Sequence, residues 1–522
     1  MGGTNFDSIV AIILAGGQNK RMRSKLPKAM HKIGGKPMLG MVYDAVKRIG
    51  IKRIVFVVGF GANNIFEYFG GDVEYAYQSE QLGTGHALLT GLEYLNDPAA
   101  YAIPAVGQHG GDAAGAAASD TATGAAAADA EAAGAATAPL GIPFNGRVLA
   151  LYGDMPFISS DTIAALAEQN ITNGEQGTLL YADMPDPYGL GRIIRDASGN
   201  FVKIIEQKDT TEEEARIREA NVGAYCFEAV PARAALKRLG TDNSQGEMYL
   251  TDVFVEIVGA GGRVGMHEIS DMRECLGAND RVALAEMNRV LHKEKCARLM
   301  LDSGVTIIDP DSTYIDQDVE IGMDSIVYPG CVLEGGAEIG GNCVIGPNAR
   351  ISASKVGEGA KIQYSVVTGA VIGPGATIGP FANLRPGSEV GAGTKIGDFV
   401  EIKNSNIGEK AAISHLAYIG DADIGSNVNI GCGVITCNYD GKAKHRTTIG
   451  SNAFIGSNAN LIAPVTVSEN SYVASGSTIT DDVPEDALAI ARGRQVNKEH
   501  WVSKKNMRRD GKEIMVPNEY PR

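Results

Sequence analysis

Aliphatic residues recur at every sixth position across much of the second half of the chain, between residues 321 and 479. Three in-phase groups contain them: Ile321, Val327, Leu333, Ile339, Ile345 and Ile351, then Ile372, Ile378, Leu384, Val390, Ile396 and Ile402, and last Ile449, Ile455, Leu461, Val467, Val473 and Ile479. A helix repeats about every 3.6 residues and an ordinary strand every 2, so neither explains this period. A chance run of small residues in an ordinary sheet would not keep the register through three groups. The pattern predicts the hexapeptide coils of a parallel β-helix, whose short strands each point one aliphatic residue inward.

The first third of the chain alternates short aliphatic runs with stretches of helical periodicity. The runs are Ile9–Leu14, Ile54–Val58 and Arg147–Tyr152. Such runs are typical of parallel strands buried on both faces, and their alternation with helices predicts a doubly wound, Rossmann-like α/β sheet. Between Asp280 and Leu301 apolar residues return at helical spacing, which predicts a helix leading into the β-helix. We therefore expect three parts: residues 1–281, a linker helix at 282–303, and residues 304–522.

Two segments fit neither pattern. Residues 98–145 consist largely of Ala, Gly, Asp and Thr, with few large apolar residues through which a helix could dock. We interpret this segment as a mobile surface insertion, with a solvated helical hairpin as the alternative. After Ile490 the six-residue pattern ends, and a basic tail follows that contains Arg492, Arg494, Lys498, Lys504, Lys505, Arg508 and Arg509.

The composition narrows the class of protein. At 522 residues the chain is too long for one core, and its 44% hydrophobic and 21% charged content is ordinary for a globular protein. The net charge of −15 argues against a nucleic-acid-binding protein, which needs a broad basic surface, but leaves nucleotide binding open. No window approaches a transmembrane length of uninterrupted apolar residues. Seven scattered cysteines without paired spacing favour a reducing compartment, so we expect a cytoplasmic protein.

Candidate chemistry begins directly after the first predicted strand. Gly16 and Gly17 there would let backbone N–H groups approach a phosphate or nucleobase, and Arg21 adds positive charge. About half of such glycine turns are only structural, but Lys28 follows closely in a Leu-Pro-Lys sequence. Asp154 ends another strand, at the carboxyl edge of a parallel sheet where a metal ion would bind. A helix cap or a turn is the alternative role for this aspartate taken alone.

More of the chain then resembles one family. The segments that carry the resemblance are Leu14–Met22, Leu26–Lys28, Gln78–Ala87, Tyr152–Pro156, Gly189–Ile193, Glu206, Asn221–Gly223 and Gly277–Arg281. They are similar to motifs of sugar nucleotidyltransferases, which join a sugar 1-phosphate to a nucleoside triphosphate and release pyrophosphate. With a hexapeptide β-helix behind them, the chain resembles the bacterial bifunctional N-acetylglucosamine-1-phosphate uridylyltransferase/glucosamine-1-phosphate N-acetyltransferase family from Ile9 to about Arg494. The resemblance implies a left-handed β-helix and synthesis of UDP-N-acetylglucosamine for cell-wall precursors, with acetyl-CoA, sugar 1-phosphates and UTP as small-molecule substrates.

The resemblance also implies roles in uridylyl transfer. It implies Mg²⁺ bound by Asp154 and Asn279, with Lys28 and Arg21 as catalytic cations beside the phosphates. The residues implied to contact UTP or the nucleotide sugar are Leu14, Ala15, Gly16, Lys28, Gln78, Gly83, Thr84, Tyr152, Gly153, Asp154, Gly191, Glu206, Asn221 and Asn279.

Polar residues also stand within the β-helix pattern. Acetyl transfer to an amine needs a base to remove the ammonium proton, and a neutral histidine suits this near pH 7. A lone histidine is more often a surface or packing residue, but the resemblance implies that His415 is the base and that Glu401 orients it. The residues implied to contact glucosamine 1-phosphate or acetyl-CoA are Arg385, Lys403, Tyr418, Asn429, Cys432, Asn438, Tyr439, Ser457, Ser475 and Arg492. The resemblance further implies a homotrimer with acetyltransferase sites at subunit boundaries.

Two other functions compete with this interpretation. One is a sugar-1-phosphate nucleotidyltransferase whose β-helix only regulates or oligomerises, but a purely structural coil has no need of His415, Lys403 and Asn438. The other is a non-enzymatic scaffold, which would not need Lys28 and Asp154.

Overall fold

The computed structural model describes residues 6–17, 21–103 and 143–504, which form two compact units divided between Lys293 and Glu294. Most of the alanine-rich segment expected at 98–145 and the tail from residue 505 lie outside the described residues. Within the described residues, no helix is long and apolar enough to cross a membrane.

The first unit is built on a nine-stranded mixed sheet. Its main path runs β11-β7-β10-β6-β1-β4-β5, and β8 pairs with both β10 and β9. The strands are β1 (Ile9–Leu14), β4 (Arg53–Val58), β5 (Glu74–Tyr77), β6 (Arg147–Tyr152), β7 (Gly177–Asp183), β8 (Arg192–Arg195), β9 (Phe201–Ile205), β10 (Glu219–Glu228) and β11 (Val264–Glu268). A separate small hairpin joins β2 (Lys32–Ile33) to β3 (Lys36–Pro37). Strands β6, β1, β4 and β5 are parallel, whereas β10 runs antiparallel to β6 and β7.

Helices cover both faces of this sheet. They are α1 (Met38–Arg48), α2 (Ala62–Phe69), α3 (Thr84–Tyr94), α4 (Ser160–Thr172), α5 (Ala229–Leu236) and α6 (Val253–Gly259). Side chains alternate across a strand, so Ile13 of β1 packs into the core formed with α1, α2 and α4, while its neighbour Ile12 packs with α3, α5 and α6. The uninterrupted apolar strand is therefore buried on both faces, and the predicted doubly wound arrangement is confirmed.

The three central parallel strands end at one edge of the sheet, which positions the first site. In the parallel register Leu14 lies opposite Tyr152 on one side and Val57 on the other. Past these ends, Gly153 donates its backbone N–H to the carbonyl of Leu14 at 3.0 Å, and Ala15 donates to Val57 at 2.9 Å. The loops after β1 and β6 therefore leave the sheet side by side.

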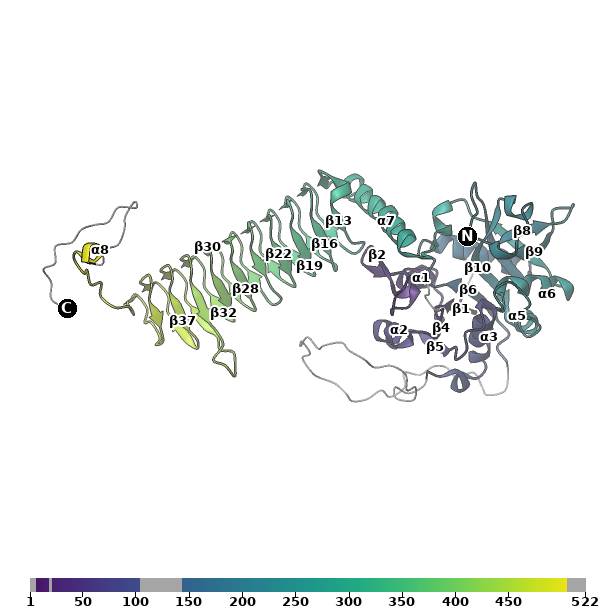
Figure 1. Ribbon diagram of the computed structural model, residues 1–522, viewed down its shortest axis with the longest axis horizontal. Coiled ribbons are helices and arrows are strands. Elements are labelled where there is room, and N and C mark those ends of the chain that lie inside the picture. Colours follow the sequence, from purple (N-terminus) through teal and green to yellow (C-terminus); the bar gives the residue numbers. More distant parts are fainter. Residues whose placement is uncertain (1–5, 18–20, 104–142, 505–522) are drawn as a thin grey trace. The chain divides into compact units, whose positions relative to one another are not determined.

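The second unit is the parallel β-helix expected from the six-residue period, and it is left-handed as the family resemblance implied (Figure 1). Helix α7 (Arg281–Leu301) leads into it. Each coil gives one strand to each of three parallel sheets, of eleven, ten and nine strands. The sheets run from β12 (Thr306–Ile307) to β41 (Leu488–Ala489), from β13 (Tyr314–Ile315) to β40 (Thr478–Ile479), and from β14 (Glu320–Ile321) to β38 (Val465–Val467).

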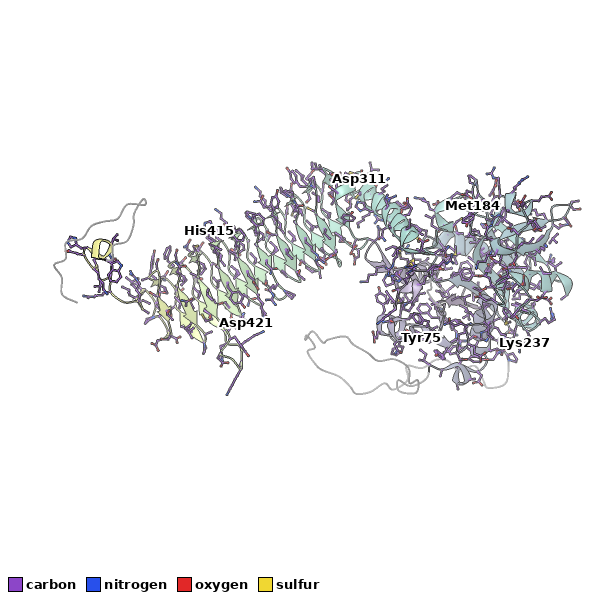
Figure 2. The ribbon with its side chains drawn as sticks, viewed as in Figure 1. Tyr75, Met184, Lys237, Asp311, His415 and Asp421 are labelled. Carbon is purple, nitrogen blue, oxygen red and sulfur yellow. The ribbon has the colours of Figure 1, made fainter. Side chains whose placement is uncertain are left out.

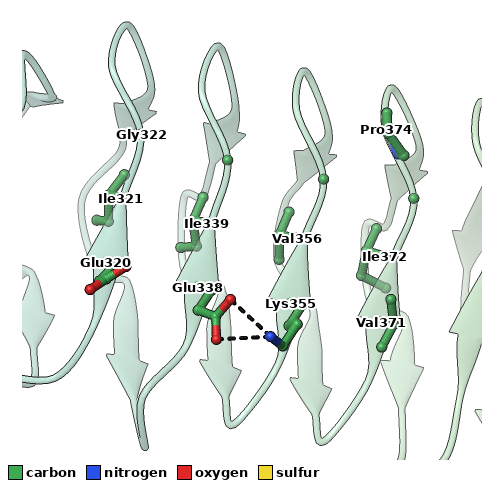
Figure 3. Close-up of a pocket in the computed structure, with 13 residues that line it drawn as sticks. Glu320, Ile321, Gly322, Glu338, Ile339, Lys355, Val356, Val371, Ile372 and Pro374 are labelled. Carbon is green, nitrogen blue, oxygen red and sulfur yellow. Dashed lines mark hydrogen bonds and ion pairs between the residues drawn. The ribbon is translucent and has the colours of Figure 1, made fainter.

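The pairing register between adjacent coils explains both the six-residue period of the aliphatic residues and its one-residue shift. Paired residues of adjacent coils lie 18 positions apart where three hexapeptides complete a turn, as in Ile378↔Ile396. Elsewhere they lie 17 apart, as in Ile339↔Val356, which is where the sequence pattern shifts by one residue. Figure 3 shows the alternation that results, because Ile339 and Val356 point inward while Glu338 of β17 (Glu338–Ile339) and Lys355 of β20 (Lys355–Val356) form an ion pair of 3.0 Å outside.

Close coil contact also restricts one corner of the β-helix to glycine. A Cβ added to Gly425 would lie 2.5 Å from the backbone nitrogen of Ser451 in the next coil. Since real Cβ atoms do not approach backbone this closely, the small residues between the aliphatic positions are a steric requirement of coil stacking.

Candidate active sites

Lys28 is the centre of the site at the sheet edge of the first unit. It lies at the start of a short 3₁₀ helix (Lys28–Met30). Its Nζ forms an ion pair with the carboxylate of Asp154, just past β6, and donates to Oδ1 of Asn279 at 3.0 Å. Arg21 donates to the same Asn279 oxygen at 3.5 Å. Four residues proposed from the sequence, on four separate segments, thus meet at one site, where Asp154 and Asn279 contact the Lys28 ammonium and Arg21 contacts Asn279.

This arrangement of oxygen atoms fits a divalent cation. The Asp154 carboxylate and the Asn279 amide oxygen already contact one positive charge, and both are oxygen ligands of the kind that Mg²⁺ prefers. The described residues contain no cluster of three or more His, Cys, Asp and Glu side chains that could enclose a metal by themselves. A cation here would therefore complete its coordination with water and phosphate oxygens, as Mg²⁺ usually does. The side chains of Lys28 and Asp154 are each 24% exposed, which leaves room for such ligands.

The segment proposed to bind the nucleobase packs against the glycine turn after β1. Gln78 is buried and its side-chain amide contacts Nδ1 of His86 at 3.0 Å. Gln81 donates to the carbonyl of Gly16 at 2.7 Å, which fixes the turn from the other side. A Cβ at Gly16 would lie 3.1 Å from the backbone nitrogen of Gly59 and 3.2 Å from Oε1 of Gln78. A glycine is therefore favoured here by close packing, and Gln81 is a contact that the site-residue predictions did not include.

Gly83 precedes helix α3 and Thr84 begins it, and both residues join this segment to residues 248–250. The φ of Gly83 is +118°, and a Cβ there would lie 2.7 Å from the carbonyl oxygen of Met248. The hydroxyl of Thr84 accepts a hydrogen bond from the backbone N–H of Leu250 at 3.1 Å. Both residues hold the loop in place whether or not they also contact a nucleotide.

The residues proposed to bind the sugar form a second, more buried group. Asn221 on β10 donates its backbone N–H to the carbonyl of Gly191 at 2.9 Å and its side-chain amide to the hydroxyl of Tyr225 at 2.8 Å. The ring of Tyr225 packs edge-on against that of Tyr152. Glu206 accepts a hydrogen bond from the hydroxyl of Thr251 at 3.0 Å.

Glu206 is electrostatically unusual within this group. Burial raises the pKa of its carboxyl, and the nearby Asp252 and Asp209 raise it further, although the Thr251 hydrogen bond opposes them. Beyond the Thr251 hydrogen bond, the Glu206 carboxylate retains oxygen lone pairs that can accept hydrogen bonds from sugar hydroxyls.

In the β-helix, five polar residues form one line along a corner. The strands concerned are β27 (Lys395–Asp398), β30 (Ala412–His415), β33 (Asn429–Ile430), β36 (Phe454–Ile455) and β39 (Tyr472–Val473), whose inward residues Ile396, Ile413, Ile430, Ile455 and Val473 are paired in sequence. Two positions beyond each inward residue stand Asp398, His415, Cys432, Ser457 and Ser475, which we call the corner ladder. Neighbouring strands lie about 4.8 Å apart, so His415 and Ser475 are roughly 14 Å apart.

The corner ladder brings together residues that the sequence proposed for the base and for acetyl-CoA. Asn429 lies on the outward side of β33, paired with Ala412 of the His415 strand. Arg492 lies near the far end, where its Cδ would be 3.8 Å from a Cβ added at Gly476. Cys432 is one of seven free cysteines and stands between His415 and Ser457.

The partner of His415 differs from the expectation. Nδ1 of His415 contacts Oδ1 of Asp398, on the preceding coil, at 2.6 Å. Glu401, expected to orient the histidine, instead accepts a hydrogen bond from Arg385 at 3.0 Å. The reason is register, because Glu401 pairs with Tyr418 in the neighbouring sheet whereas Asp398 pairs with His415. The sequence did contain a signal for Asp398, since it precedes His415 by one 17-residue coil.

A second polar group surrounds Asp421, which lies between β31 (Tyr418–Gly420) and β32 (Ala422–Ile424) in the same coil as His415 (Figure 2). Burial alone would raise the pKa of Asp421, but hydrogen bonds from Asn404 and Asn438 and the charges of Lys403 and Lys444 hold it below its usual value. Asn438 also lies 3.5 Å from the hydroxyl of Tyr418. These contacts bring Tyr418, Lys403 and Asn438 together, as the sequence proposed.

Three cations lie beside this group, and one of them, Lys444, was not predicted from the sequence. The ammonium of Lys444, then burial, lower the pKa of Lys403, and Arg385 acts in the same direction. We call Arg385, Lys403 and Lys444 the cationic cluster. Lys444 stands in an excursion that begins near the exposed Tyr439, with which it forms a β-bridge. The sequence signal was the spacing, since Ile424 pairs with Ile449 over 25 residues instead of 17 or 18.

Like charges held this close favour an anion between them. Glu401 and Asp421 already balance part of this positive charge, and the remainder would attract a phosphate group, since arginine and lysine both donate strongly to phosphate oxygens. The described part of the β-helix thus combines a histidine paired with a carboxylate, a group of three cations and an extended polar ladder.

Comparison with known proteins agrees with this organisation. Residues 11–184 match the MobA-like NTP transferase domain, and residues 318–353, 369–404 and 446–481 match the bacterial transferase hexapeptide (six repeats). The bifunctional protein GlmU of Caldanaerobacter subterraneus subsp. tengcongensis is 46% identical, over 96% of this chain and 98% of that protein. The GlmU proteins of Acetivibrio thermocellus (45%, over 97% of this chain and 100% of that protein) and Geobacillus sp. WCH70 (44%, over 96% and 99%) are similarly related.

Proposed function

The chain belongs to the family of the bifunctional protein GlmU, and we propose that the residues described above carry out the two reactions of that enzyme. The protein is a bifunctional transferase of UDP-N-acetylglucosamine synthesis, with acetyltransferase and uridylyltransferase activities. The competing interpretation, in which the β-helix only regulates the enzyme or holds subunits together, is therefore excluded. We assign uridylyl transfer to residues 1–281 and acetyl transfer to residues 304–522.

In uridylyl transfer, an oxygen of the sugar phosphate attacks the α-phosphorus of UTP in line, without a covalent enzyme intermediate. Lys28 and Arg21 neutralise the charge that develops on the phosphates. Magnesium held by Asp154 and Asn279, when bound, would add charge neutralisation at the same phosphates. The glycine turn, Gln78 and the start of α3 hold the uridine, while Gly191, Glu206 and Asn221 hold the amino sugar. The observation that carries this assignment is the convergence of Arg21, Lys28, Asp154 and Asn279.

In acetyl transfer, the amine of glucosamine 1-phosphate attacks the thioester carbonyl of acetyl-CoA, and the thiolate of CoA leaves. His415 accepts the proton of the amine through Nε2. The cationic cluster binds the sugar phosphate, and Tyr418, Asn429, Asn438 and Tyr439 position the sugar. The thioester arm of acetyl-CoA extends along the corner ladder past Cys432, Ser457 and Ser475, with Arg492 near its phosphates. Direct aminolysis needs no thiol nucleophile, so Cys432 only packs against this arm.

We also propose a homotrimer, with the acetyltransferase site at the boundary between subunits. The support is an exposed apolar column beside the corner ladder, formed by Tyr364, Phe381, Phe399 and Leu416 on four successive coils. Each is between 42% and 57% exposed, and the rings of Phe381 and Phe399 stack with centroids 5.4 Å apart. A continuous exposed apolar surface of this kind favours a protein contact. A monomer in light scattering at working concentration would contradict the shared site.

We propose a cytoplasmic location, because all seven cysteines are free, as expected in a reducing compartment.

The Asp154→Asn variant tests the assignment of the two reactions. It should lower uridylyl transfer at least about a hundredfold, since it removes one of the charged groups around the phosphates, and leave acetyl transfer intact. Acetyl transfer is measured by thiol release from acetyl-CoA with glucosamine 1-phosphate, and uridylyl transfer by pyrophosphate release. Equal loss of both activities would refute two independent sites.

A further inference from the structure

We propose that Asp398 is the positioning residue of the acetyltransferase site and that it holds His415 in the tautomer and orientation in which Nε2 accepts the proton of the amine. This inference rests on the proposed acetyl transfer and gives the role expected of Glu401 to a different carboxylate.

The first support is geometric. Asp398 and His415 are opposite residues of a parallel pair, β27 and β30, and their side chains meet with Nδ1 and Oδ1 2.6 Å apart. The backbone fixes the same two coils together immediately beyond this pair, since Leu416 donates its N–H to the carbonyl of Asp398 at 2.9 Å. The contact therefore joins two side chains whose Cα positions are set by the β-helix itself.

The second support is chemical. An ionised carboxylate can only accept a hydrogen bond, so the proton of a neutral His415 must reside on Nδ1, and Nε2 carries the lone pair. The hydrogen bond from His415 in turn holds the pKa of Asp398 below its usual value, which keeps the carboxylate ionised. When Nε2 takes the amine proton, the new imidazolium lies beside a negative charge, which lowers the energy of the proton-transfer step.

Among the described residues of the strands packed against β30, no other carboxylate contacts the imidazole of His415. Strand β27 also carries Lys395, the coil of β33 carries Cys432, and β31 (Tyr418–Gly420) begins with Tyr418. Glu401 is engaged with Arg385 on the neighbouring face. Asp398 is thus the anion that faces the imidazole.

The test is the pH dependence of acetyl transfer in Asp398→Asn, with saturating acetyl-CoA and glucosamine 1-phosphate. The kcat should fall about tenfold to a hundredfold while both KM values stay within about twofold, because the carboxylate contacts the base and not the substrates. The acid limb of the kcat profile should move to lower pH, because an imidazolium without its anionic partner loses its proton more readily. Asp398→Glu, which keeps the charge, should recover part of kcat and move the acid limb back.

Two controls separate the possible failures. Glu338→Gln removes a carboxylate paired with Lys355 elsewhere on the β-helix and should leave the acetyl-transfer profile unchanged. Uridylyl transfer by the Asp398 variants should match the unsubstituted protein if they fold normally. If the unsubstituted protein acetylates glucosamine 1-phosphate and Asp398→Asn keeps its kcat and acid limb, the positioning role is refuted while the proposed function stands. If the unsubstituted protein transfers no acetyl group, the proposed function itself fails.

Discussion

Replacing Lys28 by methionine should weaken catalysis and at the same time strengthen metal binding. In the structure the Lys28 ammonium occupies the position between Asp154 and Asn279 where a divalent cation would bind, so the two positive charges compete for the same oxygens. Methionine keeps the length and packing of the side chain but removes the charge. The competition should therefore end without a large rearrangement of the loop.

The expected change in metal affinity follows from the solvent exposure of the Lys28–Asp154 ion pair. Both side chains are 24% exposed, and ion pairs that solvent reaches contribute about 0.2 to 1 kcal/mol. The additional hydrogen bond to Asn279 favours the upper end of that range. Removing a competitor worth about 1 kcal/mol should tighten metal binding about fivefold. Loss of a cation beside the reacting phosphates should lower uridylyl transfer about a hundredfold or more.

The assay is titration of Mn²⁺, as a paramagnetic substitute for Mg²⁺, into the protein without nucleotide, followed by electron paramagnetic resonance. Lys36→Met is the matched control, because Lys36 pairs with Asp44 away from this site in the same unit. The control should bind Mn²⁺ like the unsubstituted protein and keep uridylyl transfer. Weaker or unchanged Mn²⁺ binding by Lys28→Met would refute the shared position of ammonium and metal.

Three further predictions concern separate parts of the molecule. His415→Ala should lower acetyl-transfer turnover by about two to four orders of magnitude, with acetyl-CoA binding by calorimetry and uridylyl transfer nearly unchanged; near-full acetyl transfer at neutral pH would make His415 a packing residue. Glu206→Gln should raise the melting temperature at neutral pH, because the raised pKa means that folding disfavours the ionised carboxyl, so stability is lost as pH rises through the folded pKa. This gain in melting temperature should vanish near pH 4, where the unfolded chain is also largely protonated, and no gain at pH 7 would contradict the burial argument. The rate of uridylyl transfer to N-acetylglucosamine 1-phosphate should fall about tenfold in the same variant. Phe399→Asp places a charge in the exposed apolar column and should shift the molar mass in light scattering from trimer toward monomer; an unchanged trimer would place the contact elsewhere.

The sequence predicted the fold well because both units repeat a local rule. Aliphatic residues at every sixth position can be buried together only by stacked coils, and Ile402 and Ile413 are indeed fully buried. The strand Ile9–Leu14 was predicted with its bounds because it is apolar on both faces. Lys28 and Asp154 were proposed because glycine-rich turns and strand ends at one sheet edge mark sites in such folds.

The contacts between coils were harder to predict. A coil of 17 residues places Asp398 beside His415 and Glu401 beside Tyr418, whereas a coil of 18 would place Gly397 beside His415, and the aliphatic spacing reveals this coil length only where the register slips. Lys444 reaches the cationic cluster from an excursion that has no aliphatic residues to mark its path. Side-chain neighbours separated by a whole coil follow from register, and motifs within a short window do not carry that information.

The central claim, two independent active sites in one chain, is tested most directly by mixing two inactivated variants. Asp154→Asn alone and His415→Ala alone should each fail to convert glucosamine 1-phosphate, acetyl-CoA and UTP into UDP-N-acetylglucosamine at a substantial rate. Mixed in equal amounts, they should restore its formation, because N-acetylglucosamine 1-phosphate released by the first variant reaches the intact uridylyltransferase site of the second. Chromatography of the nucleotide sugar measures this outcome. A mixture no more active than either variant alone would contradict the two-site account.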